Sequence, residues 1–254
     1  MMALLGGSYQ LMLRGVRASI RQPGVEVGNI FIPLFFFFVS IGSLSAIAGS
    51  AFGVDDYKGF LVPVAIVQAV AGAASVSGIL VVTDIERGYF DKLLLTPTPR
   101  LALVAGQLLS DSIRAGFFTL IVLIVGAIAG AGMDAGIAGY VTILVLAMLF
   151  GFAYSGIGLG IGLRTGNAQA AQAGFLLFFP LLFLSPAFAP KEIFSGWLEF
   201  LANMNPVTYI LEGMRTLILV GWEWDNVLGA FASVAGLGVV TIGFALWGLR
   251  SRTA

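Results

Sequence analysis

Six long stretches of mostly apolar residues constrain this chain more than any other feature. Each holds about 20 residues or more, so a helix made of it reaches about 30 Å, the thickness of the hydrocarbon core of a bilayer. Only 10% of the 254 residues are charged. The sequence therefore predicts an all-α polytopic membrane protein in which residues 1–254 form a single transmembrane domain. The six predicted spans are 27–48, 60–82, 109–131, 139–162, 168–188 and 227–249.

The composition excludes several classes of function. The net charge is zero, so no basic field favours nucleic acid. The chain contains neither Cys nor His, which excludes zinc sites, thiol nucleophiles, disulfides and imidazole proton relays. Three arginines precede the first apolar run, as in a signal peptide, but this run is longer than the apolar part of a cleaved signal. We therefore expect the first span to remain, with the lipid bilayer as its surroundings.

Basic residues gather on one side of the predicted spans. With a cytoplasmic N-terminus, ten of the 13 Lys and Arg residues lie on the cytoplasmic side, and eight of the 13 acidic residues lie outside. The positive-inside rule favours this orientation. We expect a multi-pass protein of the plasma membrane with both termini in the cytoplasm.

The outer segment 189–226 does not fit a further simple span. It holds two apolar helical stretches, Ile193–Ala202 and Val207–Val220. The first is too short to cross, and the second carries Glu212 and Arg215, each of which costs about 2.5–3.5 kcal/mol at the bilayer centre. We expect two helices that lie in the outer interface, or that dip into the membrane and return.

The cytoplasmic loop between the second and third spans has an amphipathic pattern. At about 100° per residue, 84–94 forms a helix with one apolar half, in which Glu86 is an isolated charge. Pro97 and Pro99 end this helix. The apolar half could dock another protein or could rest on lipid. Its residues are Ile85, Tyr89, Phe90, Leu93 and Leu94.

Glycines recur at helical spacing inside two spans. Spacing of four residues lets helices approach closely, so we interpret these glycines as packing positions. A nucleotide-binding loop is the alternative, but such a loop follows a strand and opens a soluble helix. The pairs are Gly126 with Gly130, Gly156 with Gly160, and Gly158 with Gly162. Asp111 and Arg114 are also predicted to pair, at the cytoplasmic edge of one span.

The chain shows no source of energy of its own. It has no phosphate-binding loop motif, so it is not expected to be an enzyme by itself. No predicted span carries a charge in its central third, where ion-coupled carriers keep titratable groups. Energy is therefore supplied by a partner, or none is used.

Three motifs resemble the permease subunits of type-2 ATP-binding-cassette (ABC) exporters, in particular the drug-resistance branch related to daunorubicin-type exporters. The first is Arg21-Gln22-Pro23 before an apolar run, and the second runs from Glu86 through Gly88 and Asp91 to Thr96-Pro97. The third spans 190–197, Asn205 through Tyr209, and Arg215. The chain departs from the family at Tyr89-Phe90, where a small hydroxylated residue is usual, and at Ile85, where Glu is common.

The resemblance implies an architecture and a set of partners. Six spans would carry an N-terminal cytoplasmic elbow helix, a coupling helix between spans two and three, and outer re-entrant helices before span six. Two copies of a cytoplasmic ABC ATPase would bind ATP and Mg, while this chain binds no cofactor or metal. A second permease chain would complete a homodimer or heterodimer.

The resemblance also implies a function, the efflux of a hydrophobic or amphipathic, drug-like compound across a bacterial plasma membrane, as in antibiotic resistance. Export of a lipid or lipid-linked glycan, or an ion-coupled or passive carrier, are the alternatives. The implied ATPase-coupling residues are Ile85, Glu86, Arg87, Gly88, Tyr89, Asp91, Leu94, Thr96 and Pro97. The implied outer gate residues are Pro190, Trp197, Asn205, Pro206, Tyr209 and Arg215.

Overall fold

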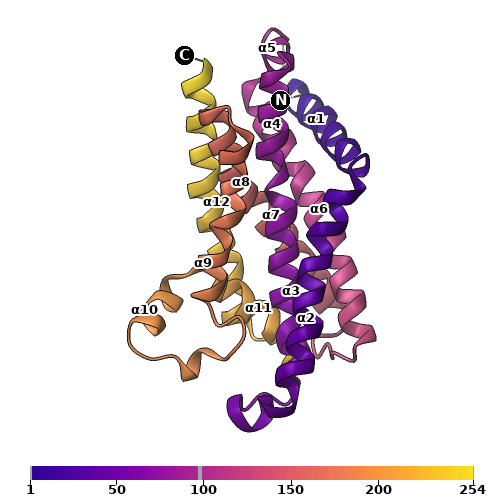
Figure 1. The fold of residues 1–254 in the computed structure, drawn as a ribbon, viewed down its shortest axis with the longest axis vertical. Coiled ribbons are helices and arrows are strands. Elements are labelled where there is room, and N and C mark those ends of the chain that lie inside the picture. Colours follow the sequence, from indigo (N-terminus) through magenta and orange to yellow (C-terminus); the bar gives the residue numbers. More distant parts are fainter. Residues whose placement is uncertain (1, 97–98, 254) are drawn as a thin grey trace.

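The computed structural model describes residues 2–96 and 99–253, and every regular element in these segments is a helix (Figure 1). Five helical segments are long and apolar enough to cross a bilayer, and they coincide with five of the six predicted spans. These segments are α2 (Pro23–Phe52), α3 with α4 (Tyr57–Glu86), α6 (Arg100–Ile128), α7 (Gly136–Thr165) and most of α12 (Trp224–Thr253).

The second span consists of two helices that continue each other. The first, α3 (Tyr57–Ala74), begins after Asp56, whose side chain accepts a hydrogen bond from the backbone N–H of Gly59 (2.9 Å). Ser75 joins it to α4 (Val76–Glu86), and the Ser75 hydroxyl donates to a backbone carbonyl of the preceding turn (2.8 Å). The span therefore carries one slight interruption at mid-length.

The predicted span 168–188 differs from the structure. It folds as two short helices, α8 (Ala168–Leu176) and α9 (Phe178–Phe183). Together they reach about 24 Å, which is less than a bilayer core. Pro180 explains the break, because its ring meets the carbonyl four residues earlier, and that residue is the last of α8. The sixth crossing therefore stays a prediction, although both pieces follow one side of the bundle (Figure 1).

An N-terminal helix, α1 (Met2–Ile20), precedes the first span and lies against α6. The two helices approach closely at Gly106, where an added methyl group would meet the side chain of Leu11. Helix α6 begins at Arg100, well before the predicted start of the third span. Arg114 consequently lies near the middle of this long helix, beside Glu26 in the first turn of α2.

Two helices occupy the segment before α12, as predicted. After a short 3-10 turn, η1 (Lys191–Ile193), α10 (Trp197–Met204) stands away from the bundle and leaves Trp197 69% exposed (Figure 1). Helix α11 (Pro206–Leu219) returns and packs against α12, α3 and α7, with most of its side chains buried. It therefore lies within the bundle rather than on its surface.

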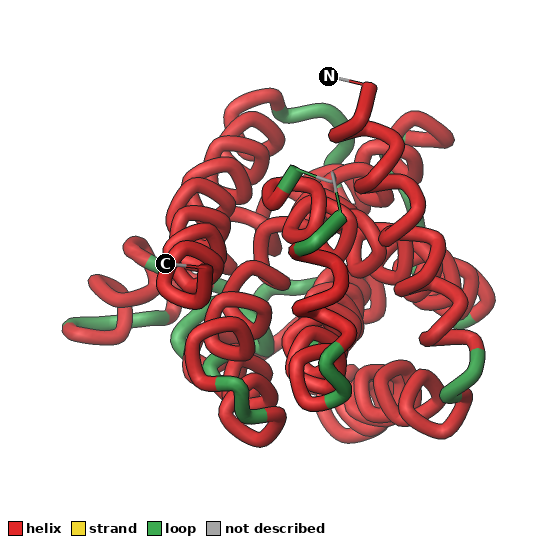
Figure 2. Tube along the Cα trace, turned by 90° about the horizontal axis from the view of Figure 1, so that it is seen from above, coloured by secondary structure: helices red, strands yellow, loops and turns green. Residues whose placement is uncertain are grey.

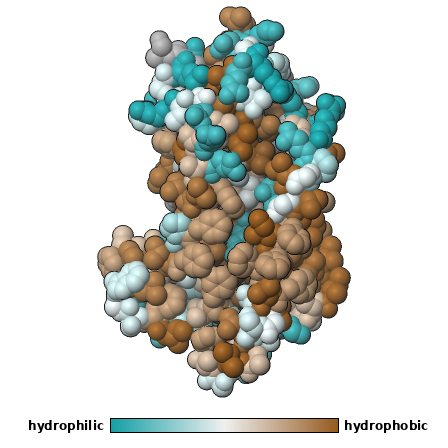
Figure 3. Space-filling model, viewed as in Figure 1, coloured by the Kyte–Doolittle hydropathy of each residue, from teal (hydrophilic) through white to brown (hydrophobic). Residues whose placement is uncertain are grey.

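The bundle is organised around α7, which packs against α12, α6, α4, α8 and α3. Viewed from above, the helices stand side by side (Figure 2). On the face drawn in Figure 3, hydrophilic residues gather over α1, α4 and α5, and apolar residues cover the bundle below them. Large apolar side chains of the bundle helices, such as Phe31, Phe117 and Val239, are exposed on its outer surface. Such a surface is suited to lipid.

Candidate functional site

The loop between the second and third spans forms a projecting tip at one end of the bundle (Figure 1). We call residues 84–96 the α4–α5 tip. Helix α4 ends at Glu86, and Gly88 then adopts a positive φ of 65°, which reverses the chain before α5 (Tyr89–Leu94). The single helix predicted over 84–94 is therefore wrong, because this glycine ends one helix and begins another.

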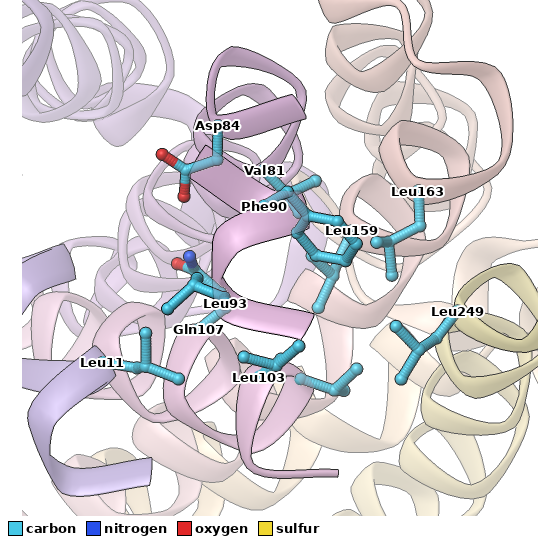
Figure 4. A pocket seen from close by; sticks show the side chains of 11 residues that line it. Leu11, Val81, Asp84, Phe90, Leu93, Leu103, Gln107, Leu159, Leu163 and Leu249 are labelled. Carbon is cyan, nitrogen blue, oxygen red and sulfur yellow. The ribbon is translucent and has the colours of Figure 1, made fainter. Parts of the chain in front are cut away.

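Phe90 anchors the tip to the bundle. Its side chain is 3% exposed and belongs to an apolar cluster formed with α1, α4, α6, α7, α8 and α12. Figure 4 shows Phe90 beside Val81 and Leu159, with Leu163 and Leu249 at the far side of the same pocket. Ile85, Leu93 and Leu94 are half-buried against this cluster. The apolar side of the tip thus faces mainly this chain's own helices, rather than either of the two surroundings considered from the sequence, another protein or lipid.

The polar side of the tip faces outward. Glu86, which the wheel placed within the apolar half, is exposed because the turn at Gly88 separates it from α5. Leu95 is 87% exposed. The other exposed members are Arg87, Tyr89, Asp91, Lys92 and Thr96. Pro97 lies outside the described residues.

Arg14 of α1 supports the base of the tip. Its guanidinium donates two hydrogen bonds to Asp84, one of them 2.8 Å long, and lies 4.2 Å from the centre of the Tyr89 ring. The hydrogen bond that Arg14 donates to Asp84 raises the pKa of Arg14 above its ordinary value. Sequence inspection missed this pair because 70 residues separate its members and neither lies in a motif that marks the other.

A second buried polar group ties three spans together. Arg114 pairs with Asp111 (3.0 Å), as predicted, and also donates to both carboxylate oxygens of Glu26 in α2 (2.8 and 3.0 Å). A fourth bond reaches the backbone carbonyl of Ala73 in α3 (2.9 Å). We call Glu26, Asp111 and Arg114 the polar cluster. The pairing of Glu26 with Arg114 could not be predicted from the sequence, in which Glu26 is only a carboxylate near the start of an apolar run.

The predicted gate residues gather at the opposite end, around α11. The Arg215 guanidinium is buried, donates to the carbonyls of Phe60 (3.1 Å) and Ala187 (2.8 Å), and lies 3.5 Å from the centre of the Phe60 ring. Lys191 pairs with Glu212 at 3.0 Å, and this hydrogen bond raises the Lys191 pKa. A cavity of about 300 Å³ opens beside these groups.

The remaining gate residues shape the α10–α11 turn. The Asn205 side chain caps α11 by accepting from the N–H of Val207 (3.0 Å), and its amide donates to the Leu181 carbonyl. Pro206 is the first residue of α11, and the Tyr209 hydroxyl donates to the Asn203 carbonyl (2.7 Å). Pro190 precedes η1, and Trp197 begins α10 on the exposed side. Among the predicted gate residues, Asn205 and Arg215 are buried, whereas Trp197 and Tyr209 are exposed.

The glycines of α7 face different neighbours. Added methyl groups at Gly156 and Gly160 would meet α12, and one at Gly162 would meet the backbone of Gly78 in α4. Gly158 approaches the backbone of α8 and Ser75. Gly126 packs on Val62 of α3. Gly130 lies beyond the end of α6 with a φ of 89°, so its predicted place in a helix contact is wrong.

The described residues hold no group of three or more carboxylates arranged to bind a metal ion. The features that remain are a projecting polar tip, an N-terminal helix bonded to it, and a cavity beside α11 at the far end. These can transmit force and admit or release a solute.

A family model described as ABC-2 type transporter matches residues 8–219. The daunorubicin resistance ABC transporter permease protein DrrB1 of Streptomyces coeruleorubidus is 28% identical over 208 residues, which cover 81% of this chain and 72% of that protein. The probable doxorubicin resistance ABC transporter permease protein DrrC of Mycobacterium tuberculosis is 24% identical, covering 84% of this chain and 77% of its own length. The probable multidrug ABC transporter permease YbhR of Escherichia coli is 29% identical over 68% of this chain and 47% of its own.

Proposed function

The chain belongs to the ABC-2 type transporter family, and we propose that it carries a hydrophobic or amphipathic, drug-like compound out of the cell as the membrane subunit of an ABC exporter. The relatives named for daunorubicin and doxorubicin resistance support a substrate of this kind. Export of a lipid or lipid-linked glycan is the alternative within the same architecture. Family membership argues against an ion-coupled or passive carrier.

We further propose that the α4–α5 tip and both termini lie in the cytoplasm. Arg87 and Lys92 of the tip, Arg17 of α1 and Arg250 near the C-terminus share one end of the bundle (Figure 1), as the positive-inside rule requires. A chain whose two ends lie on the same side of a membrane must cross it an even number of times. Five helices are long enough to cross, so one further crossing is needed. The α8–α9 pair supplies it, with the outer residues before α10 completing the passage.

The proposed energy source is a separate ATPase subunit that binds ATP and Mg. Two ATPases and two permease chains would assemble in the plasma membrane, each ATPase seating on one tip. The observation that carries this proposal is the anchoring of the tip. Phe90 fixes it to the bundle from within, while Glu86, Asp91 and Lys92 remain exposed for a partner. A push on the tip therefore reaches α4 and α7 through packed side chains.

At the outer end, α10 and α11 form the proposed exit gate. Helix α11 is held by Arg215 against α3 and by the Lys191–Glu212 pair against the segment before α10. Substrate release requires these contacts to open while the remainder of the bundle holds. Asn205 and Pro206 provide the break between the two helices.

The decisive experiment reconstitutes this chain with its ATPase in proteoliposomes and compares Glu86→Lys with the unaltered chain. The proposal predicts that both insert and assemble, and that Glu86→Lys loses most of the ATP-driven transport of a fluorescent anthracycline. Lys58→Glu, at the opposite end of the second span, is the matched charge reversal and should transport normally. Equal transport by both variants and the unaltered chain would refute the role of the tip.

A further inference from the structure

A groove of about 1100 Å³ lies between α1 and the α4–α5 tip. Four of its lining residues are arginines. Arg14 and Arg17 are three residues apart on α1, and Arg21 directly follows Ile20, the last residue of that helix. Arg87 lines the same groove from the turn of the tip. Among the described residues, no Asp or Glu lines the groove.

Most of this positive charge lacks a counter-ion. Asp84 neutralises Arg14 from beneath the groove. In residues 6–96 and 99–252, where side chains are described, no carboxylate forms an ion pair with Arg17, Arg21 or Arg87, and all three are exposed. Three guanidinium groups without partners on two sides of one groove favour an anion, and the planar donors of arginine suit a phosphate group.

The surface below the groove is apolar. Next to Arg21, Ile20 is 72% exposed, and Val27 and Phe31 at the start of α2 are each 61% exposed. Only 11% of the most apolar 18-residue stretch of α2 is buried inside the molecule. An anionic group in the groove can therefore continue into apolar chains that run along α2. An acidic peptide would use the arginines but would leave this apolar strip without a partner.

We propose that the groove binds the headgroup of an anionic phospholipid of the cytoplasmic leaflet, with the acyl chains lying along α2. This goes beyond the transport function and rests on it only for the orientation of the chain. The headgroup would bridge the face of α1 to Arg87 and so restrain the tip from the side opposite Asp84. Anionic lipid would thereby set how firmly the tip is held when the ATPase acts.

The test uses the full chain, purified in a neutral detergent, and a fluorescent short-chain phosphatidylglycerol followed by fluorescence anisotropy. The variant R17Q/R21Q/R87Q removes the three unpaired charges of the groove. The matched control, R100Q/R250Q/R252Q, removes three arginines of the same end that do not line the groove. Because each basic residue near an anionic lipid surface contributes about fivefold in affinity, the groove variant should bind more than tenfold more weakly, and the control should change by less than about twofold.

Competition identifies the bound chemistry. Unlabelled phosphatidylglycerol should displace the probe, whereas phosphatidylcholine, inorganic phosphate and an acidic peptide of glutamates should not at equal concentration. R17K/R21K/R87K should retain most of the affinity, which separates loss of charge from loss of fold. Equal weakening of the two triple variants, or displacement by phosphate or by the acidic peptide as readily as by the lipid, would overturn the proposal. Because this binding needs no ATPase, its failure leaves the exporter assignment intact.

Discussion

Arg14 in the N-terminal helix holds Asp84 at the end of the second span through two parallel hydrogen bonds. Asp84 is buried, and the same guanidinium covers the ring of Tyr89 in α5. The N-terminal helix and the α4–α5 tip are therefore bonded to each other as well as to the bundle. A displacement of the tip by a partner must move α1 or break this contact.

Asp84→Asn should weaken the link between α1 and the tip without removing side-chain volume. The amide cannot match both guanidinium donors, so Arg14 loses one charge-assisted hydrogen bond. We expect faster hydrogen exchange in α1 and in residues 84–94, and a lower coupling of ATP hydrolysis to transport. In neutral detergent without anionic lipid, Arg17→Gln removes a charge from the same helix without breaking this bond and should leave exchange in the tip unchanged. Unaltered exchange in Asp84→Asn would show that the pair does not hold the tip.

Phe90→Ala should loosen the tip from the bundle. Removing a fully buried aromatic side chain costs about 3–5 kcal/mol when the cavity does not collapse. The neighbouring Tyr89 is 38% exposed, so Tyr89→Ala should cost well under half as much. Thermal unfolding of the two purified variants measures this difference. Equal losses of stability would mean that the apolar cluster around Phe90 does not anchor α5.

The polar cluster should be most sensitive to loss of its cation. Arg114→Met leaves the buried Asp111 without its cation and removes the ion pair of the partly buried Glu26, and breaking a buried ion pair from one side costs about 3–5 kcal/mol. Glu26→Gln keeps the ion pair between Arg114 and Asp111 and should lower the free energy of unfolding by less. Adding Glu26→Gln to Arg114→Met should recover part of the loss, because one unpaired charge is removed. If the losses of stability in the two single variants simply add in the double variant, Glu26 and Arg114 are not directly coupled.

Gly78→Ala should disturb the contact of α4 with α7. An added methyl group at Gly78 would overlap the backbone of Gly158, which cannot move aside as a side chain does. We expect a clear fall in thermal stability. Gly243→Ala is the matched change in α12, where an added methyl group meets nothing within 4 Å, and it should be neutral or slightly stabilising. A neutral Gly78→Ala would mean that the two helices can separate without cost.

The Lys191–Glu212 pair gives the outer gate a predictable pH dependence. The pKa of Lys191 is raised from its ordinary 10.5, so the contribution of the protonated lysine is complete below that value. It is lost only as the pH rises through the higher pKa of the folded protein. We expect residues 186–196 to become more mobile only in that alkaline range, and Lys191→Gln to show the same mobility at neutral pH. Spin labels placed in this segment would report both effects.

The sequence predicted the features that depend on hydrophobicity and charge balance. Five apolar runs coincide with long helices, and the two outer helices lie within a few residues of their expected bounds. The Asp111–Arg114 pair was predictable because its members share one helix face. The expected ATPase-coupling and gate roles of individual residues remain predictions.

The features that the sequence did not predict depend on contacts between distant segments. A helical wheel over 84–94 assumes an unbroken helix, and Gly88 breaks it, so the wheel placed Glu86 on the wrong side. Pro180 divides the fifth apolar run, although proline is often tolerated in membrane helices. Glu26 and Arg14 find partners in other helices, and no local pattern in the sequence identifies such partners.

The central claim is that the α4–α5 tip is cytoplasmic and receives the ATPase. The chain has no cysteine, so Lys92→Cys and Asp134→Cys place single reactive thiols at opposite ends of the bundle without background. In sealed cells, a membrane-impermeant maleimide should label Asp134→Cys and not Lys92→Cys; in inverted vesicles Lys92→Cys should react, and the bound ATPase should protect it. External labelling of Lys92→Cys, or labelling that the ATPase leaves unchanged, would contradict the account.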